Sequence, residues 1–138
     1  MDAADTIRSY YDALRTGEPL GPFFADEQSG DDASVKFGIS ERLVGTEEIR
    51  AGLREQTATT VDWAVESHDL RTTERERHAW FSDAVDMGWT DTERGIRYEF
   101  ETRWSGTLER RAAEGAPTDD AAGDWQFVGM HVSTTGEI

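Results

Sequence analysis

The fold is most clearly indicated by the stretch IRYEFETRWSGTLE, residues 96–109, in which the character of the side chain alternates from one residue to the next. Apolar, aromatic or small side chains occupy every second position, namely Ile96, Tyr98, Phe100, Thr102, Trp104, Gly106 and Leu108. Charged and polar side chains fill the positions between them. Because successive side chains of a strand point to opposite faces of a sheet, this alternation predicts a long strand with one buried face and one solvated face.

Three more segments in the second half of the chain show the same period of two. They cover residues 61–71, 78–89 and 125–134, and each predicts a further strand. The segment 110–124 contains Pro117, five alanines and four acids, which predicts a long polar hairpin loop between the last two strands. This half of the chain therefore predicts a run of long antiparallel strands.

The first 60 residues show a helical period instead. Apolar side chains recur every three to four residues near the N-terminus, at Ala3, Ile7, Tyr10, Tyr11 and Leu14, and Gly17 follows them as a stop signal. A second helix is predicted from Thr46, as N-cap, to near Thr57. Helices followed by antiparallel strands predict an α+β fold, with the helices packed on one face of a curved, mostly antiparallel sheet. A chain of 138 residues has the length of a single domain, spanning 1–138.

The charge of the chain is strongly negative. Its 29 acids and 14 basic residues give a net charge of −15, and Lys36 is the only lysine among those basic residues. Nucleic acid is excluded as a partner because binding phosphates requires a basic face, and an anionic membrane would be repelled. Such a chain repels itself in dilute salt, whereas molar salt screens the repulsion. We therefore predict a halophilic adaptation.

The chain has no cysteine, which excludes disulfides, thiolate nucleophiles and cysteine-bound metals. The N-terminal residues carry acids where a signal peptide needs a basic start and an apolar run. No stretch approaches the roughly 20 apolar residues of a membrane span. A cytoplasmic protein is therefore expected.

Four motifs together resemble a known superfamily: SYYDALRTG at 9–17, VGTEEIR at 44–50, RWSGTLERR at 103–111 and WQFVGMHVS at 125–133. They resemble the SnoaL-like branch of the nuclear-transport-factor-two-like superfamily, which has a cystatin-like α+β fold. Within it, they are similar to the subgroup related to calmodulin-dependent kinase association domains. The resemblance implies a cone, in which a bent sheet wraps around the helices and leaves an interior pocket. It also implies a homodimer formed through the outer face of the sheet.

The superfamily includes isomerases, cyclases, dehydratases, binding subunits and oligomerisation modules, so the chemistry has to be argued from the residues of the pocket. By resemblance, Tyr10 matches the tyrosine that donates to an oxyanion in ketosteroid-isomerase relatives. The aspartate of those isomerases would fall in the predicted strand 34–39, where Val35, Phe37 and Ile39 alternate and no acid is present. This departure argues against proton abstraction of the steroid-isomerase type.

Two further polar residues are candidates for chemistry. His131 alternates with aromatic side chains, and the resemblance places that face inside the cone; a hydrogen-bonded structural histidine is the alternative. Asp83 shares a strand face with Phe81 and Val85, as a general acid or base would. Its alternative is a salt bridge to an arginine at the sheet surface. His78 is expected at the rim or at an interface.

Aromatic side chains at strand spacing would line an apolar pocket or simply fill the core. The complete set of pocket candidates is Tyr10, Phe24, Trp63, Phe81, Asp83, Phe100, Trp104, Phe127 and His131. No metal site is expected because the three histidines are not spaced as ligands. No cofactor is expected either, since no glycine-rich loop is present to hold phosphates.

These observations favour a homodimer that binds a small apolar or aromatic molecule without demonstrable catalysis, paired through an outer sheet face with Trp80, His78 and Arg103. A cyclase, isomerase or hydrolase that uses Asp83 or His131 with Tyr10 is the second hypothesis. The third is a pure oligomerisation module whose pocket is filled by its own side chains.

Overall fold

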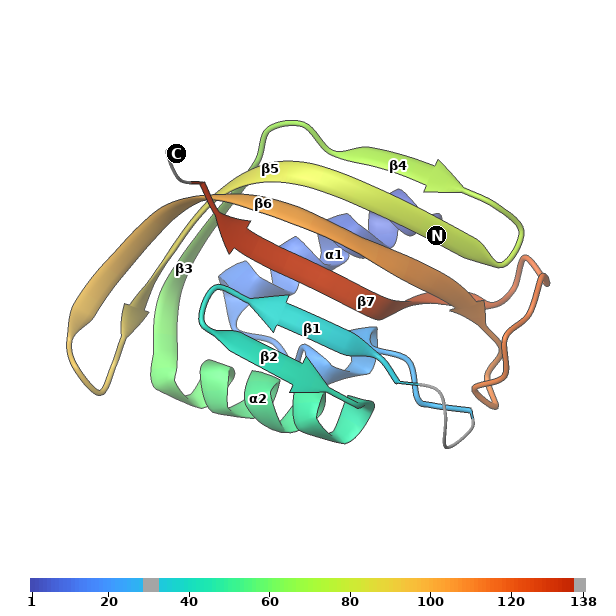
Figure 1. Ribbon diagram of the computed structural model, residues 1–138, viewed down its shortest axis with the longest axis horizontal. Helices are drawn as coiled ribbons and strands as arrows, with labels where there is room; N and C mark the ends of the chain where they lie inside the picture. Colours follow the sequence, from blue (N-terminus) through green and yellow to red (C-terminus); the bar gives the residue numbers. More distant parts are fainter. Residues whose placement is uncertain (29–32, 136–138) are drawn as a thin grey trace.

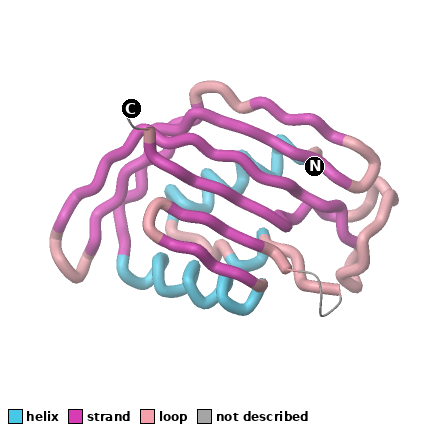
Figure 2. The backbone as a smooth tube through the Cα atoms, viewed as in Figure 1, coloured by secondary structure: helices cyan, strands magenta, loops and turns pink. Residues whose placement is uncertain are grey.

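The structure, a computed structural model, describes residues 1–28 and 33–135. In chain order its elements are α1 (Ala3–Thr16), the 3-10 turn η1 (Gly21–Phe23), β1 (Val35–Gly38), β2 (Glu41–Val44), α2 (Thr46–Thr59), β3 (Thr60–Ser67), β4 (Arg71–Glu74), β5 (His78–Asp91), β6 (Ile96–Arg111) and β7 (Asp124–Thr134). Helices precede the long strands, and both helices lie on the same side of a curved sheet (Figure 1, Figure 2). The predicted α+β class is confirmed.

The strands of the described residues form one seven-stranded sheet in the order β2-β1-β7-β6-β5-β3, with β4 also paired to β5. The neighbouring pairs in this part of the chain are antiparallel except β1 and β7, which are parallel, so the sheet is mixed. β6, the strand on which the fold prediction rests, has 16 residues and lies between β5 and β7. None of the described helices is long and apolar enough to cross a membrane.

The first helix forms as its sequence predicts. Asp2 caps its start and Asp5 bonds back to the Asp2 backbone, while Gly17 ends it with a φ of 72° that favours glycine. The inward face buries Ile7, Tyr10 and other apolar side chains in the core. Packing of this face against the sheet stabilises α1 beyond what its own backbone bonds provide.

The start of α2 and the segment 61–71 differ from prediction. The N-cap of α2 is Gly45, with a φ of 92°, and Thr46 lies inside the helix. The free backbone N–H of Thr46 donates to the Glu27 carboxylate at 2.7 Å. The predicted strand 61–71 ends early, as β3 at Ser67, and a separate strand β4 starts only at Arg71. Between the two strands the Asp69 backbone N–H bonds to the Asp83 side chain, where a ladder bond would otherwise continue.

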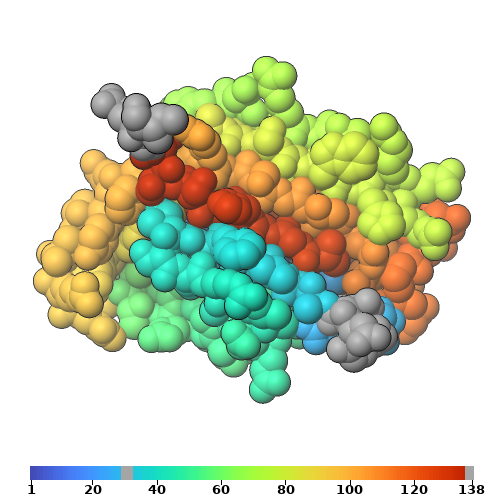
Figure 3. Space-filling model, viewed as in Figure 1, coloured from blue at the N-terminus to red at the C-terminus, as the bar shows by residue number. Residues whose placement is uncertain are grey.

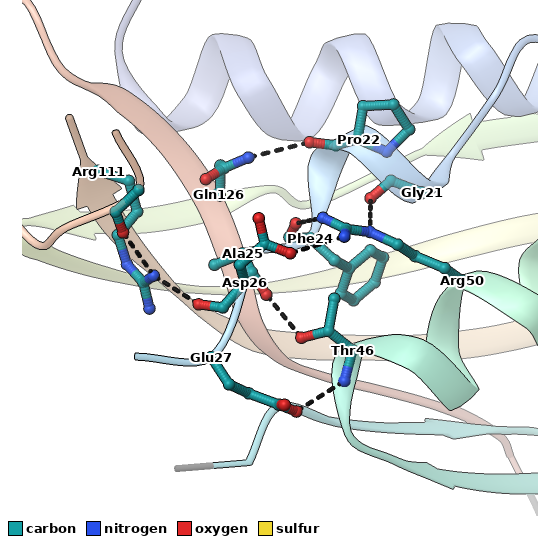
Figure 4. Close-up of polar contacts among 11 residues, drawn as sticks. Gly21, Pro22, Phe24, Ala25, Asp26, Glu27, Thr46, Arg50, Arg111 and Gln126 are labelled. Carbon is teal, nitrogen blue, oxygen red and sulfur yellow. Dashed lines mark hydrogen bonds and ion pairs between the residues drawn. The ribbon is translucent and has the colours of Figure 1, made fainter. Parts of the chain in front are cut away.

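The segment before β1 is held by side chains from two other parts of the fold (Figure 4). Arg50 of α2 donates to the Phe24 carbonyl at 2.9 Å and to the Asp26 carboxylate at 2.6 Å. Arg111, at the end of β6, donates to the Asp26 carbonyl at 2.7 Å. These bonds satisfy backbone groups of a loop and fix where the chain enters the β1–β2 hairpin.

A β-bulge in β7 decides which of its side chains face inward. Leu108 of β6 pairs with Phe127, whereas Thr107 pairs with Gly129, so Val128 is an extra residue. The extra residue changes the alternation between the two ends of the strand. Trp125 and Phe127 are buried before the bulge, Met130 and Val132 are buried after it, and His131 is exposed.

Candidate functional site

A cavity of about 500 Å³ lies between the helices and the inner face of the sheet. Its walls come from α1, the β1–β2 hairpin, α2, β3, β5, β6 and β7. This volume is in the range of small-molecule sites, which span roughly 300 to 1,000 Å³. The curvature of the long strands toward β3 and α2 encloses this side of the molecule (Figure 1).

One wall of the cavity is a layer of stacked aromatic rings. Trp63 and Trp89 stack with their centroids 5.0 Å apart and their planes at 20°. Trp89 also packs against Tyr98 at 5.5 Å and against Phe100 at 5.6 Å. Flat aromatic surfaces of this kind bind planar apolar groups through offset stacking and burial of apolar area. Trp104 extends the lining toward α1.

The position of Trp63 depends on a second bulge, in β3. The pairing of β3 with β5 shifts between Val61 and Ala64, and Asp62 there has a positive φ of 56°. The Asp62 carbonyl accepts from the Arg97 guanidinium at 2.5 Å, and the indole N–H of Trp63 donates to the Thr60 hydroxyl at 2.8 Å. These bonds hold the indole in its orientation at the cavity wall.

The polar part of the lining contains Lys36, Glu41 and Tyr10. The Lys36 ammonium forms a salt bridge with the Glu41 carboxylate; the lysine side chain is 6% exposed and the glutamate side chain 37%. Burial, and secondly the charge of Glu41, raise the pKa of Tyr10 well above its ordinary value. The Tyr10 phenol therefore remains a neutral hydrogen-bond donor across physiological pH.

Lys36 faces inward because of how β1 pairs with β7. Lys36 is aligned with Met130 and Phe37 with His131, so each pair shares a face of the sheet. Met130 is buried, and Lys36 lies beside it on the inner face. Phe37 is instead 39% exposed, with its ring 5.5 Å from that of His131 on the outer face. The sequence alternation suggested the reverse orientation, because an exposed phenylalanine and a buried lysine go against the usual preferences.

Eight of the nine predicted pocket residues separate into three groups. Tyr10, Trp63, Phe100 and Trp104 border the cavity. Phe24, Phe81 and Phe127 are buried in the core, where the Phe127 ring lies 5.5 Å from Phe24 and 5.9 Å from Phe81. The bulge in β7 places His131 on the outer face, so the predicted inward orientation of this side chain is wrong.

Asp83 is on the inner face, as its alternation suggests, but it belongs to a hydrogen-bond network. It is 5% exposed and accepts from the Tyr11 hydroxyl at 2.9 Å and from the Ser67 hydroxyl at 2.6 Å. Its other oxygen accepts from the Asp69 backbone N–H at 3.0 Å. Burial and the bond to Asp83 raise the pKa of Tyr11 above its ordinary value. The carboxylate therefore joins α1, β3 and the β3–β4 turn to β5. The alternative prediction for Asp83, a salt bridge to an arginine at the surface of the sheet, does not match these partners or this buried position.

Replacing Asp83 by alanine is expected to lower the free energy of unfolding by about 1 to 3 kcal/mol, because the buried Tyr11 hydroxyl loses its acceptor. Chemical denaturation in molar potassium chloride measures this loss. Asp86→Ala is the matched control, since that side chain is 53% exposed and pairs with exposed His68; a change within about 0.5 kcal/mol is expected. Equal losses in the two variants would contradict a structural role for Asp83.

The remaining histidines lie on the surface. His78 Nε2 is 2.8 Å from the Glu109 carboxylate, and His68 Nε2 is 2.8 Å from that of Asp86. The bond to Asp86 raises the pKa of His68. Glu66 completes a group whose possible ligand atoms lie within 4.8 Å of one another, with all three residues exposed. Sequence spacing does not reveal this group, because β3 and β5 contribute to it through their pairing.

Comparisons with known proteins support the fold. No protein-family model matches the sequence, and no curated protein matches it. Among solved structures, a candidate dehydratase of the NTF2-like (nuclear-transport-factor-two-like) family from Streptomyces avermitilis superposes with a TM-score of 0.76 at 13% identity, covering 96% of this chain and 93% of that one. A ketosteroid isomerase-like protein from Erwinia carotovora gives a TM-score of 0.70 at 16% identity, covering 97% and 94%.

A third structure is a candidate calcium/calmodulin-dependent protein kinase II association domain from Xanthomonas campestris. Its TM-score is 0.71 at 16% identity, and the match covers 98% of this chain and 86% of that one. The order of helices and strands, the curved mixed sheet and these superpositions agree with the sequence motifs. The chain therefore has the NTF2-like α+β cone fold.

Proposed function

We propose that this protein binds a flat, largely apolar small molecule in the cavity between its helices and sheet. The observation that carries the proposal is a space of about 500 Å³ bordered by both an aromatic layer and a partly buried ion pair. The stacked rings of Trp63 and Trp89 suit a planar ring system. Lys36, Glu41 and the neutral phenol of Tyr10 suit one polar group on that ring system.

This proposal is favoured over an oligomerisation module with a self-filled pocket. The large core rings of Phe24, Phe81 and Phe127 pack together beside the cavity, and a space of about 500 Å³ remains. This space is partly open to solvent, so a small molecule can enter it. A space of this size with an aromatic lining is better explained by an occupant.

Proton transfer to the bound molecule is the second candidate function, and it is favoured by the place of the ion pair. Tyr10 is a neutral donor beside a carboxylate, so it can stabilise a developing oxyanion while Glu41 or Lys36 exchanges a proton. The fold is shared with the candidate dehydratase and the isomerase-like protein, which is consistent with this chemistry. Asp83 and His131 have no part in it, because neither borders the cavity among the described residues.

The outer face of the sheet, the side of the molecule that Figure 3 shows, is proposed to pair with a second copy of the chain. Trp80 is 48% exposed there with the Arg75 guanidinium 5.3 Å from its ring, and Phe37 is exposed beside His131. Exposed aromatic side chains on a sheet face are typical of protein interfaces. The net charge of −15 opposes close approach of two copies in dilute salt, whereas molar salt screens this repulsion, so the pairing is expected to strengthen with salt concentration.

The binding proposal is tested with 2-naphthol, a planar molecule with one hydroxyl, titrated by calorimetry in molar potassium chloride. Trp63→Ala is expected to weaken binding about tenfold, the value of roughly one aromatic stacking contact. Trp80→Ala is the matched control because that indole is on the outer face, and its affinity should equal that of the unmodified protein. Absence of saturable binding, or equal weakening in both variants, would contradict the proposal.

A further inference from the structure

The single lysine of this chain lies in the cavity. The chain has 14 lysine and arginine residues, and all of them except Lys36 are arginines. An arginine side chain remains protonated at any pH that the protein tolerates. A lysine amine can release its proton and then act as a nucleophile. Lys36 is therefore the one basic side chain that can become a nucleophile in this way. It lies on the inner face of β1, where its side chain is 6% exposed.

The charge of Lys36 is balanced by a carboxylate that the hairpin brings to it. Glu41 begins β2 and pairs with Gly38, the last residue of β1. A Cβ atom on residue 38 would lie 2.7 Å from both Cγ and Oε1 of Glu41, so the glutamate side chain crosses directly over this glycine to reach Lys36. The glycine therefore gives the carboxylate its path to the amine, and the pair is able to exchange a proton.

The surroundings favour reaction with a carbonyl compound. The amine shares the cavity with the aromatic layer, which holds a planar ring by stacking, and with Tyr10, which can donate to a carbonyl oxygen. The Lys36 side chain is 6% exposed, so the amine itself has little contact with water. An aromatic aldehyde or ketone would thus be held with its carbonyl at the polar side of the lining.

We infer that Lys36 forms an imine with an aromatic aldehyde or ketone bound in this cavity, an inference that rests on the binding function proposed above. Glu41 takes a proton from the Lys36 ammonium, and the freed Nζ lone pair attacks the carbonyl carbon. The carbonyl oxygen takes one of the two protons that remain on Nζ, which gives a neutral carbinolamine. The C–O bond then breaks as Glu41 returns its proton to the hydroxyl, and water leaves as the C=N bond forms. Glu41, again a carboxylate, accepts the last proton of Nζ to give the neutral imine. No oxidant or reductant is needed.

The experiment traps this imine with 2-naphthaldehyde and sodium cyanoborohydride in molar potassium chloride, followed by mass spectrometry of the intact protein and of its peptides. The reagent converts an imine to a stable secondary amine. The expected result is one naphthylmethyl group on the peptide that contains Lys36, and suppression of this labelling by excess 2-naphthol. Labelling confined to the amine of Met1, or labelling of Lys36 that 2-naphthol does not suppress, would overturn the inference.

Variants separate this inference from the binding function. Lys36→Arg should lose the label at residue 36, and a thermal unfolding transition like that of the unmodified protein would report that the variant is folded. Glu41→Gln should slow trapping at Lys36 at least tenfold at neutral pH, because loss of a general acid–base typically costs about 10² to 10⁴ in rate. Gly38→Ala should slow it similarly, since the added methyl group displaces the Glu41 carboxylate. Unchanged trapping in both variants would overturn the role of Glu41.

The two proposals fail in different ways. If 2-naphthol does not bind, the binding function itself is wrong. If 2-naphthol binds with the expected dependence on Trp63 while 2-naphthaldehyde leaves Lys36 unlabelled, only the imine inference is wrong.

Discussion

Replacing Phe127 by alanine is expected to lower the free energy of unfolding by about 3 to 5 kcal/mol. Phe127 has no exposed surface, and its ring lies 5.3 Å from that of Tyr10 and 5.5 Å from that of Phe24. It therefore joins α1, the segment after η1 and the sheet in one cluster of rings. Truncation removes this apolar burial and leaves a void that the surrounding backbone cannot close completely.

Urea denaturation in molar potassium chloride measures the loss from the shift of the unfolding midpoint. Phe37→Ala is the matched control, since the same side chain is removed from a position that is 39% exposed on the outer face of the sheet. Its expected cost is below about 1 kcal/mol. The assignment of Phe127 to the core is wrong if the two variants lose similar stability.

Replacing Gly106 by alanine is expected to cost about 2 to 3 kcal/mol through overpacking. The added Cβ would lie 2.5 Å from the carbonyl oxygen of Gly129 and 2.8 Å from Cε1 of Phe81. The bulge in β7 brings that carbonyl over Gly106, and the pairing of Gly129 with Thr107 keeps the backbone from moving away. The strain therefore has to be relieved by separating β6 from β7.

Thermal unfolding compares this variant with Gly129→Ala, the control on the opposite strand. A Cβ on residue 129 would have no atom within 4 Å, so this methyl group should leave the melting temperature nearly unchanged. The Gly106 variant should melt several degrees lower, as expected for a loss of a few kcal/mol in a domain of this size. Equal melting temperatures would show that β6 and β7 adjust to the added methyl group.

The sequence predicts the helices and most strands because their apolar periods are long and regular. The run that contains Tyr98 and Trp104 forms β6, with those side chains on the inner face, and four cavity residues are identified from such patterns. Lys36 was missed for a physical reason. In the short strand β1, alternation alone favours burial of Phe37, whereas the inner face is determined by pairing with β7, far away in the chain.

Bulges explain the other differences. The outward orientation of His131 follows from one extra residue in β7, and no periodicity in the sequence reveals where such a residue is placed. For Asp83 the sequence identifies the inner face correctly. Its partners Tyr11 and Ser67 come from α1 and β3, so only the tertiary structure shows that this carboxylate is satisfied.

The bulge at Val128 also bears on how proteins of this fold diverge. In a relative whose β7 lacked the bulge, so that Val128 paired with Thr107, the end of the strand would be shifted by one residue, with His131 facing the interior and Met130 facing solvent. The two proteins would then differ in whether an imidazole reaches the cavity, although both have histidine at this position. A column-by-column alignment would still place the two histidines together, so shared identity at this position does not establish a shared role.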